Sequence, residues 1–187
     1  GGFRDGPSGK FPSFFAYDIK DNPSYQYYFD HDQDGRVFYG EGIFMGYRYW
    51  DQSKQKPRYA FGHGLSYTNF RYGKIKANKK SFNQGESVSI SVTVKNTGSV
   101  KGAEVVQLYV GDRKSRLPRP KKELKAFDKV VLNPGETKTV SFTLKQDAFA
   151  FYDPELHAWD IEPGNFDILL GSSSDKIREK ISIKIKP

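Results

Sequence analysis

The sequence predicts an all-β protein in which an antiparallel β-sandwich follows an irregular, aromatic-rich segment. Several segments between residues 87 and 186 alternate apolar and polar residues, which is the pattern of a strand with one buried face. Turn signals such as Asn133-Pro134-Gly135 separate these segments. No segment shows a sustained helical period, and only a brief helical turn is expected at 146–148. Strands at regular spacing without helices favour a sandwich.

The strands of the sandwich are assigned in chain order. Residues 87–94 alternate Ser and Thr with Val and Ile, whereas residues 104–110 are more continuously apolar, as expected for a central strand. Residues 139–144, 165–170 and 180–186 complete the set. The lysines of the last segment would lie on its solvent face, where they would protect an edge strand from pairing with another chain.

The chain changes composition abruptly near residue 72. Residues 1–72 contain 20 of the 29 aromatic residues but only four Val, Ile or Leu, whereas residues 73–187 contain 26 Val, Ile or Leu. We therefore predict an N-terminal unit at 1–71 and a sandwich at 72–187. The N-terminal unit has too few aliphatic residues for a core of its own, and we do not expect it to fold alone.

The composition argues against several classes of function. The chain has no cysteine, which rules out disulfides and thiolate metal sites. No apolar run approaches the ~18 residues of a membrane span, so a membrane is not an expected partner. The net charge is +8, but the basic half is poor in the exposed rings that stack on bases. Nucleic acid is therefore not an expected partner, and no cofactor is expected.

Motifs along nearly the whole chain resemble one enzyme family. Two of them, YGEGIFMGYRYWD at 39–51 and FGHGLSYTNF at 61–70, are similar to the end of the second domain of family 3 glycoside hydrolases. Three further stretches resemble, in order, parts of the C-terminal fibronectin type III-like domain of that family. They are EVVQLYV at 104–110, NPGETKTVSFTL at 133–144 and EPGNFDILLGSSS at 162–174. The resemblance implies an immunoglobulin/fibronectin type III-like sandwich at 72–187, preceded at 1–71 by the tail of an α/β domain and a linker.

The resemblance also implies a role. Such enzymes are β-glucosidases, which hydrolyse terminal β-D-glucosyl residues. Their nucleophilic aspartate lies in an N-terminal barrel, and their acid/base glutamate lies upstream in the α/β domain. No position here matches either motif, so we assign no catalytic residue and expect the chain alone to be inactive. It would stabilise those missing domains, which are its expected partners together with the parent's β-glucoside or oligosaccharide substrate. A secreted parent is favoured over a cytoplasmic one.

The sequence departs from the family pattern at two places. Tyr59-Ala60 stands where a Phe-Pro pair is usual, and Phe11 stands where leucine is usual. Neither change touches a group that could take part in catalysis. The sequence also opens without a methionine, and we expect it to be processed or to be part of a longer chain.

Three residues of the aromatic segment are candidates for catalysis by residue type alone. Glu41 lies among rings and glycines, and His63 and Ser66 are close in sequence. Retaining glycosidases need two carboxylates about 5–5.5 Å apart, and Glu41 has no evident partner. A triad needs a third group, which is not evident either. We expect all three side chains to bond nearby backbone instead.

The stretch DHDQDGRVFYGE fits the pattern of a calcium-binding loop. Asp30, Asp32, Asp34 and Glu41 occupy ligand positions, and Gly35 allows the sharp turn. The flanking residues, however, are aromatic and proline-broken, whereas such a loop needs a helix on each side. An acidic surface turn is therefore the favoured interpretation, and Ca²⁺ binding is the alternative.

A carbohydrate- or polymer-binding module without catalysis is the alternative function. Exposed rings would then stack on sugars, and the candidates are Tyr49, Trp50 and Trp159. We expect the rings of the N-terminal unit to form its core instead, because nothing else there could. We expect Trp159, on a predicted hairpin, to pack on the sandwich.

The stretch PRYAFGHGLSYTNF is predicted to join the two units. Gly62 and Gly64 would let the backbone bend and approach its neighbour closely. Phe70 and Tyr72 would lead into the first sandwich strand. The rings expected to be largely buried at this joint are Tyr59, Phe61, Tyr67 and Phe70.

Overall fold

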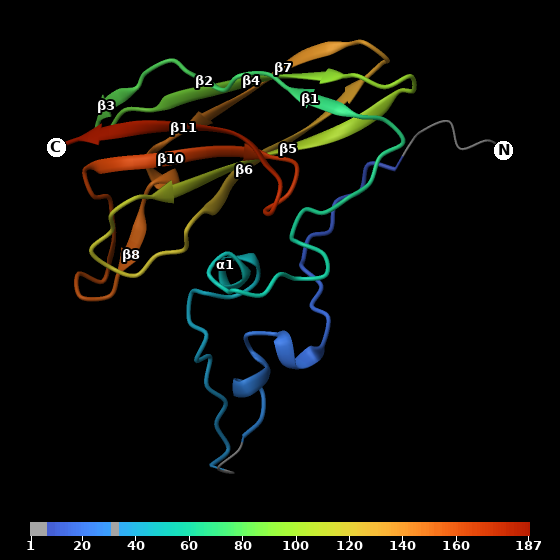
Figure 1. Cartoon of the computed structure of the whole chain (residues 1–187). Coiled ribbons are helices and arrows are strands. Elements are labelled where there is room, and N and C mark those ends of the chain that lie inside the picture. Colours follow the sequence, from blue (N-terminus) through green and yellow to red (C-terminus); the bar gives the residue numbers. More distant parts are fainter. Residues whose placement is uncertain (1–6, 31–33) are drawn as a thin grey trace.

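The chain forms a two-sheet β-sandwich with an irregular N-terminal segment below it (Figure 1). The structure is a computed structural model and describes residues 7–30 and 34–187. The N-terminal segment, coloured blue to teal, extends away from the sandwich and returns to it through α1 (Figure 1). The predicted all-β sandwich is confirmed.

The first sheet is built around β4. It contains β1 (Phe70–Tyr72), β2 (Lys76–Ala77), β4 (Val88–Asn96) and β7 (Thr137–Leu144). β4 pairs with β7 along one edge and with both short strands along the other, always antiparallel. Buried and more exposed positions alternate strictly along β4, because its Val and Ile side chains all point to the same face. This is the strand expected at 87–94.

The second sheet has the order β3-β11-β10-β5-β6. Its strands are β3 (Ser81–Asn83), β5 (Gly102–Asp112), β6 (Glu123–Leu132), β10 (Gly164–Gly171) and β11 (Ile177–Lys186). All pairs are antiparallel except β3 with β11. β3 pairs only with residues 184–186, so the rest of β11 is an edge strand. Lys180 is exposed there as expected, whereas Lys184 and Lys186 lie where β3 pairs.

The core lies between the two sheets. Its aliphatic part comes from alternate residues of β4, β5, β7, β10 and β11. Phe149 closes one end of this core and is fully buried. Its ring lies edge-to-face against Phe166 at 5.2 Å and tilted against Phe82 at 5.6 Å, so that three rings from distant parts of the chain meet there.

The remaining elements are short. They are η1 (Ile19–Asp21), η2 (Tyr25–Tyr27), α1 (Tyr47–Trp50), η3 (Gln146–Ala148) and a hairpin of β8 (Phe151–Asp153) with β9 (Ala158–Asp160). The helical turn expected at 146–148 is confirmed as η3. Within 7–30 and 34–187 no helix has the length and apolar character needed to span a bilayer.

Two expectations about aromatic burial are wrong. At the joint, Tyr67 and Tyr59 are exposed, while Phe61 and Phe70 are half-buried. Trp159 lies on the predicted hairpin, but its side chain points outward and is 72% exposed. The reason is strand alternation in β8 and β9: the inward positions are taken by other residues, which leaves Trp159 on the outer face.

Truncation of Phe149 is expected to destabilise the sandwich strongly. Phe149→Ala removes a fully buried ring and leaves a cavity between Phe82 and Phe166, which should lower the free energy of unfolding by about 3–5 kcal/mol. Urea denaturation measures this loss. The matched control is Phe127→Ala on β6, whose ring is 68% exposed and whose truncation should change stability by less than about 0.5 kcal/mol. Equal effects of the two substitutions would contradict this account of the core.

Candidate functional site

The N-terminal segment exposes an unusually apolar surface. Fourteen of the twenty exposed large hydrophobic side chains in the described residues lie between Phe11 and Tyr67. They include Tyr39 at 80% exposure and Ile19 at 71%. Large apolar patches on a protein surface mark sites of contact with other protein or ligand. The first unit therefore lacks an aliphatic core, and the expectation that its rings would form a core instead is wrong for most of them. Trp50 is the exception, because its ring is buried against Phe14 and Tyr49.

Unpaired polar atoms accompany this surface. Five buried side-chain atoms in the described residues have no hydrogen-bond partner, and three of them belong to Glu41, Trp50 and Asp51. They are the carboxylate Oε2 of Glu41, the indole Nε1 of Trp50 and the carboxylate Oδ2 of Asp51. A buried polar atom without a partner costs about 1–3 kcal/mol, so a cluster of them indicates a surface that is incomplete.

A packed joint holds this segment against the sandwich. The ring of Tyr47 in α1 lies 5.1 Å from that of Phe61 and edge-to-face with that of Tyr109 at 5.9 Å. Its hydroxyl accepts a hydrogen bond of 2.8 Å from the backbone N–H of Leu124 in β6. Burial raises the pKa of both tyrosine hydroxyls, so each stays protonated. Tyr109 donates its hydroxyl proton to Gln107, which lies beside it on the same face of β5.

Three ion pairs cross the joint. Asp51 pairs with Lys122, Arg48 Nη2 lies 3.1 Å from Glu123 Oε1, and Lys10 Nζ lies 3.0 Å from Glu104 Oε1. The Asp51 and Lys122 side chains are only 14% and 11% exposed. Burial raises the pKa of the Asp51 carboxyl, and the hydrogen bond and charge of Lys122 oppose that rise. The pairs fix the position of the segment along the strands.

The glycines of the joint behave as predicted. Gly62 is buried with a φ of +79°, a conformation that other residues rarely adopt, and a Cβ there would lie 2.3 Å from Gln107 Nε2. A Cβ on Gly64 would lie 2.3 Å from the carbonyl oxygen of Gly9. Between these glycines and the sandwich, the Phe61 carbonyl accepts a 2.9 Å hydrogen bond from the N–H of Ser174. β1 then begins at Phe70, as expected.

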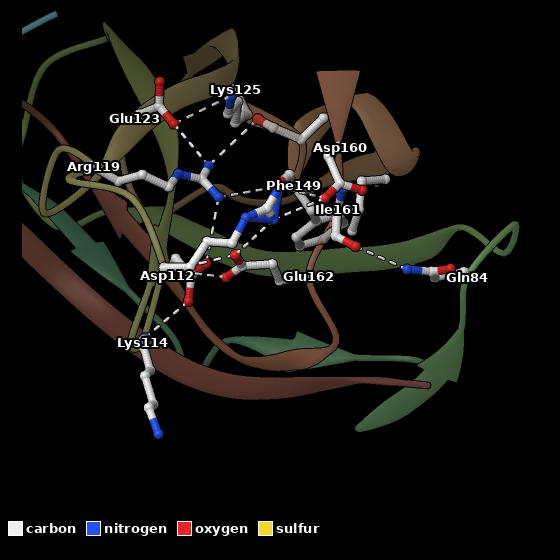
Figure 2. Close-up of polar contacts among 12 residues, drawn as sticks. Gln84, Asp112, Lys114, Arg119, Glu123, Lys125, Phe149, Asp160, Ile161 and Glu162 are labelled. Carbon is white, nitrogen blue, oxygen red and sulfur yellow. Dashed lines mark hydrogen bonds and ion pairs between the residues drawn. The ribbon is translucent and has the colours of Figure 1, made fainter. Parts of the chain in front are cut away.

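A buried charge network extends from the joint to the β8–β9 hairpin (Figure 2). Arg119 is 6% exposed at its side chain and lies 3.0 Å from Glu123 and 3.4 Å from Asp112. It also donates a 3.1 Å hydrogen bond to the carbonyl of Phe149. Glu123 thus pairs with Arg119 on one side and with Lys125, at 3.7 Å, on another. Burial lowers the pKa of the Lys125 ammonium, and the Glu123 charge opposes that effect.

Arg116 holds the hairpin in place. Its guanidinium pairs with Asp153 in β8, with Asp160 in β9 at 2.9 Å and with Glu162 at 3.2 Å. It also lies over the ring of Phe151, 4.9 Å from the centroid. The backbone N–H of Leu156, then that of Glu155, and the Arg116 charge lower the pKa of Asp153, which keeps this carboxylate ionised. Sequence reasoning missed both arginines, because nothing local marks Arg116 or Arg119 as paired.

The three catalytic candidates from the sequence do not assemble. His63 lies tilted against the rings of Phe11 and Tyr59, with centroids 6.0 and 5.0 Å away. Ser66 Oγ accepts a 3.4 Å hydrogen bond from the N–H of Thr68. His63 and Ser66 line a common polar cavity of about 240 Å³, but no hydrogen bond in the described residues joins them. Glu41 lies apart from both, in a second cavity beside Phe14 and Phe15.

The candidate calcium loop is described only in part. Asp32 lies outside the described residues. Asp30 accepts hydrogen bonds from the N–H groups of Asp34 at 3.1 Å and Gly35 at 2.8 Å, which is the geometry of an acidic turn. The upstream flank is the 3-10 turn η2, and the downstream flank is a turn at 40–43, with the four-residue helix α1 beginning only at Tyr47. Within the described ranges, no group of three or more potential metal-ligating side chains is found. Calcium binding remains a hypothesis.

Comparison with known proteins places these features in a larger context. The fibronectin type III-like domain family matches residues 104–174. Thermostable beta-glucosidase B of Acetivibrio thermocellus is 49% identical over 179 residues, covering 96% of this chain and 23% of that protein. Beta-glucosidase BoGH3A of Bacteroides ovatus is 40% identical over 181 residues, covering 95% of this chain and 24% of that protein.

Solved structures agree with the sequence comparison. The chain superposes on a GH3 beta-glucosidase of Bifidobacterium adolescentis with a TM-score of 0.89, at 36% identity and with coverage of 97% of this chain and 26% of that one. A beta-glucosidase of Kluyveromyces marxianus in complex with glucose gives 0.88 at 40% identity, covering 96% and 21%. The chain thus spans about a quarter of the length of these relatives. It matches the C-terminal portion of beta-glucosidases of glycoside hydrolase family 3 and includes a region that matches the fibronectin type III-like domain.

Proposed function

We propose that this chain is the C-terminal structural portion of a β-glucosidase that hydrolyses terminal β-D-glucosyl residues. Residues 1–71 would complete the α/β domain of the parent enzyme, and residues 72–187 would form its fibronectin type III-like domain. The relatives are named as beta-glucosidases, and the chain matches them over almost its whole length. The catalytic pair would lie in the parts of the parent that the match does not cover.

One observation carries this proposal: the apolar surface of the N-terminal segment. Its exposed rings and the unpaired atoms of Glu41, Trp50 and Asp51 lie together on one segment. A surface of this kind gains about 25 cal/mol for every Å² that another protein surface removes from water. We infer that the barrel and the remainder of the α/β domain cover it. The joint at Tyr47, Lys122 and Glu123 would then hold the covered surface rigidly to the sandwich.

No catalytic step is assigned to this chain. No catalytic pair is proposed among Glu41, His63 and Ser66, and no cofactor is required by a glycosidase of this type. The second candidate function, carbohydrate binding without catalysis, is favoured by one specific observation, the outward position of Trp159.

Activity on an aryl β-glucoside tests the proposed division of roles between this chain and its parent. The 187-residue chain alone is expected to give no turnover, because both catalytic carboxylates would lie outside it. The longer protein that contains it is expected to release the aryl group with ordinary Michaelis–Menten kinetics. Turnover by the chain alone would contradict its structural role. A longer protein that binds but does not hydrolyse β-glucosides would contradict the proposed parent activity.

The ion pair between Asp51 and Lys122 should contribute measurably to the stability of the joint. Lys122→Met leaves the Asp51 carboxylate partly buried without its partner, which should weaken the joint by about 2 kcal/mol, less than for a fully buried pair. The amide of Leu124, which donates to Tyr47, reports this loss through its hydrogen-exchange protection factor. The double variant Asp51→Asn, Lys122→Met is the matched control, and it should recover most of the protection because no unpaired charge remains.

The same variant should depend on pH in a defined direction. Without Lys122, the pKa of Asp51 rises further above its ordinary value of 3.8. A carboxyl with a raised folded-state pKa contributes stability below its unfolded-state pKa, and this contribution is lost as pH rises through the folded-state pKa. Protection of Leu124 in Lys122→Met should therefore be greater below the ordinary Asp51 pKa of 3.8 than at neutral pH. A pH-independent protection factor would show that Asp51 is hydrated, not buried.

A further inference from the structure

A groove of about 560 Å³ runs between the β8–β9 hairpin and the connection from β5 to β6. One wall carries the rings of Tyr152 and Trp159, and the other carries Leu117 and Pro118. Charged side chains also line it, among them Glu123 and Lys125 from β6. Its size and its mixture of apolar walls with a few polar groups are those of a small-molecule site.

The two rings form a paired surface on the outer face of the hairpin. Tyr152 and Trp159 are direct cross-strand neighbours, and their rings meet edge-to-face at 5.9 Å. Tyr152 is 49% exposed and Trp159 is 72% exposed. The inward positions of β8 are taken by Phe151 and Asp153, both buried. The rings are thus exposed because of strand alternation, and not because they lie on a frayed loop.

The hairpin that carries the rings is fixed from behind. Arg116 pairs with carboxylates on both of its strands, and the guanidinium groups of Arg116 and Arg119 lie over the inner face of Phe151 at 4.9 and 5.3 Å. Arg119 also donates to the carbonyl of Ala150 at 3.4 Å. Fixed rings lose little conformational entropy on binding a ligand, so the surface is pre-organised.

The polar groups of the groove supply both a donor and an acceptor. Lys125 Nζ lies 3.7 Å from Glu123 Oε2, and Arg48 pairs with the same carboxylate at 3.1 Å. Arg119 is shared between Glu123 and the Asp112 carboxylate behind it. The three cations that line the groove, Arg48, Arg119 and Lys125, are therefore all engaged with the one lining carboxylate, Glu123, and do not stand as free charges. Such a wall suits a neutral ligand rich in hydroxyl groups, because each hydroxyl both donates and accepts a hydrogen bond.

We propose that this groove binds a neutral pyranose oligosaccharide, with the apolar face of a sugar ring on Trp159 and hydroxyl groups bonded to Glu123 and Lys125. A sugar ring combines an apolar face of C–H groups with a polar edge, which matches a groove lined both by aromatic rings and by charged groups. The choice of a glucose-containing chain rests on the proposed function.

Calorimetric titration of the 187-residue chain with cellohexaose tests this proposal directly. Saturable binding is expected, and Trp159→Ala should weaken it by about tenfold through loss of the stacked ring. Trp159→Phe keeps a flat ring at the same place and should retain most of the affinity. Phe127→Ala, which removes an exposed ring of β6 outside the groove, should leave the affinity unchanged. Unchanged melting temperatures of the variants would establish that the fold is intact.

Repeating the titration at different ionic strengths gives a second, independent test. Because the ligand is neutral, a roughly tenfold rise in salt should change the dissociation constant by less than about twofold. An absence of saturable binding, equal losses for Trp159→Ala and Phe127→Ala, or binding seen only with an acidic sugar would each overturn the proposal. Failure here leaves aryl β-glucoside hydrolysis by the longer protein untouched, whereas binding without that hydrolysis would overturn only the proposed parent activity.

Discussion

The burial of β5 on both faces is the constraint on which the rest of this structure depends. One face carries Val106, Leu108 and Val110 into the core between the sheets. The other carries Gln107 and Tyr109, which are 3% and 0% exposed although they lie on the outside of the sandwich. A lone sandwich would leave these two side chains in water. The returning N-terminal segment covers them, and so this segment belongs structurally to the sandwich.

Several details of the joint follow from the way the N-terminal segment covers the outer face of β5. Tyr109 loses contact with water and donates its hydroxyl to Gln107, and the Gln107 amide in turn donates to the carbonyl of Ser172 at 3.0 Å. Gly62 lies where any side chain would collide with Gln107. The ion pairs at the rim then decide where along the strands the segment rests, because apolar contacts alone have little directional preference. Hydrophobic cover and charge pairing thus have separate roles.

The sequence was informative where structure is local. Regular alternation revealed β4, β7 and β11, whose two faces have different surroundings, and glycine positions revealed the bend at Gly62. β6 escaped strand assignment because much of it is half-buried on both faces, which erases the alternation. The joint was located but its ion pairs were not, since Asp51 and Lys122 are 71 residues apart. The orientation of Trp159 was mistaken because strand alternation in the hairpin turns its ring to the outer face beside Tyr152, and the sequence did not show which face of the hairpin would be the inner one.

The cover over β5 also bears on how such proteins are assembled from parts. The composition changes near residue 72, and a strand begins at Phe70, so a cut there looks natural. Yet a cut at that point would strip Tyr47, Phe61 and Gly62 from the strand they cover. A sandwich transferred by recombination must therefore carry these upstream residues with it or find a replacement for them on its new host. The unit that natural or laboratory gene fusion can exchange is longer than the unit defined by its strands.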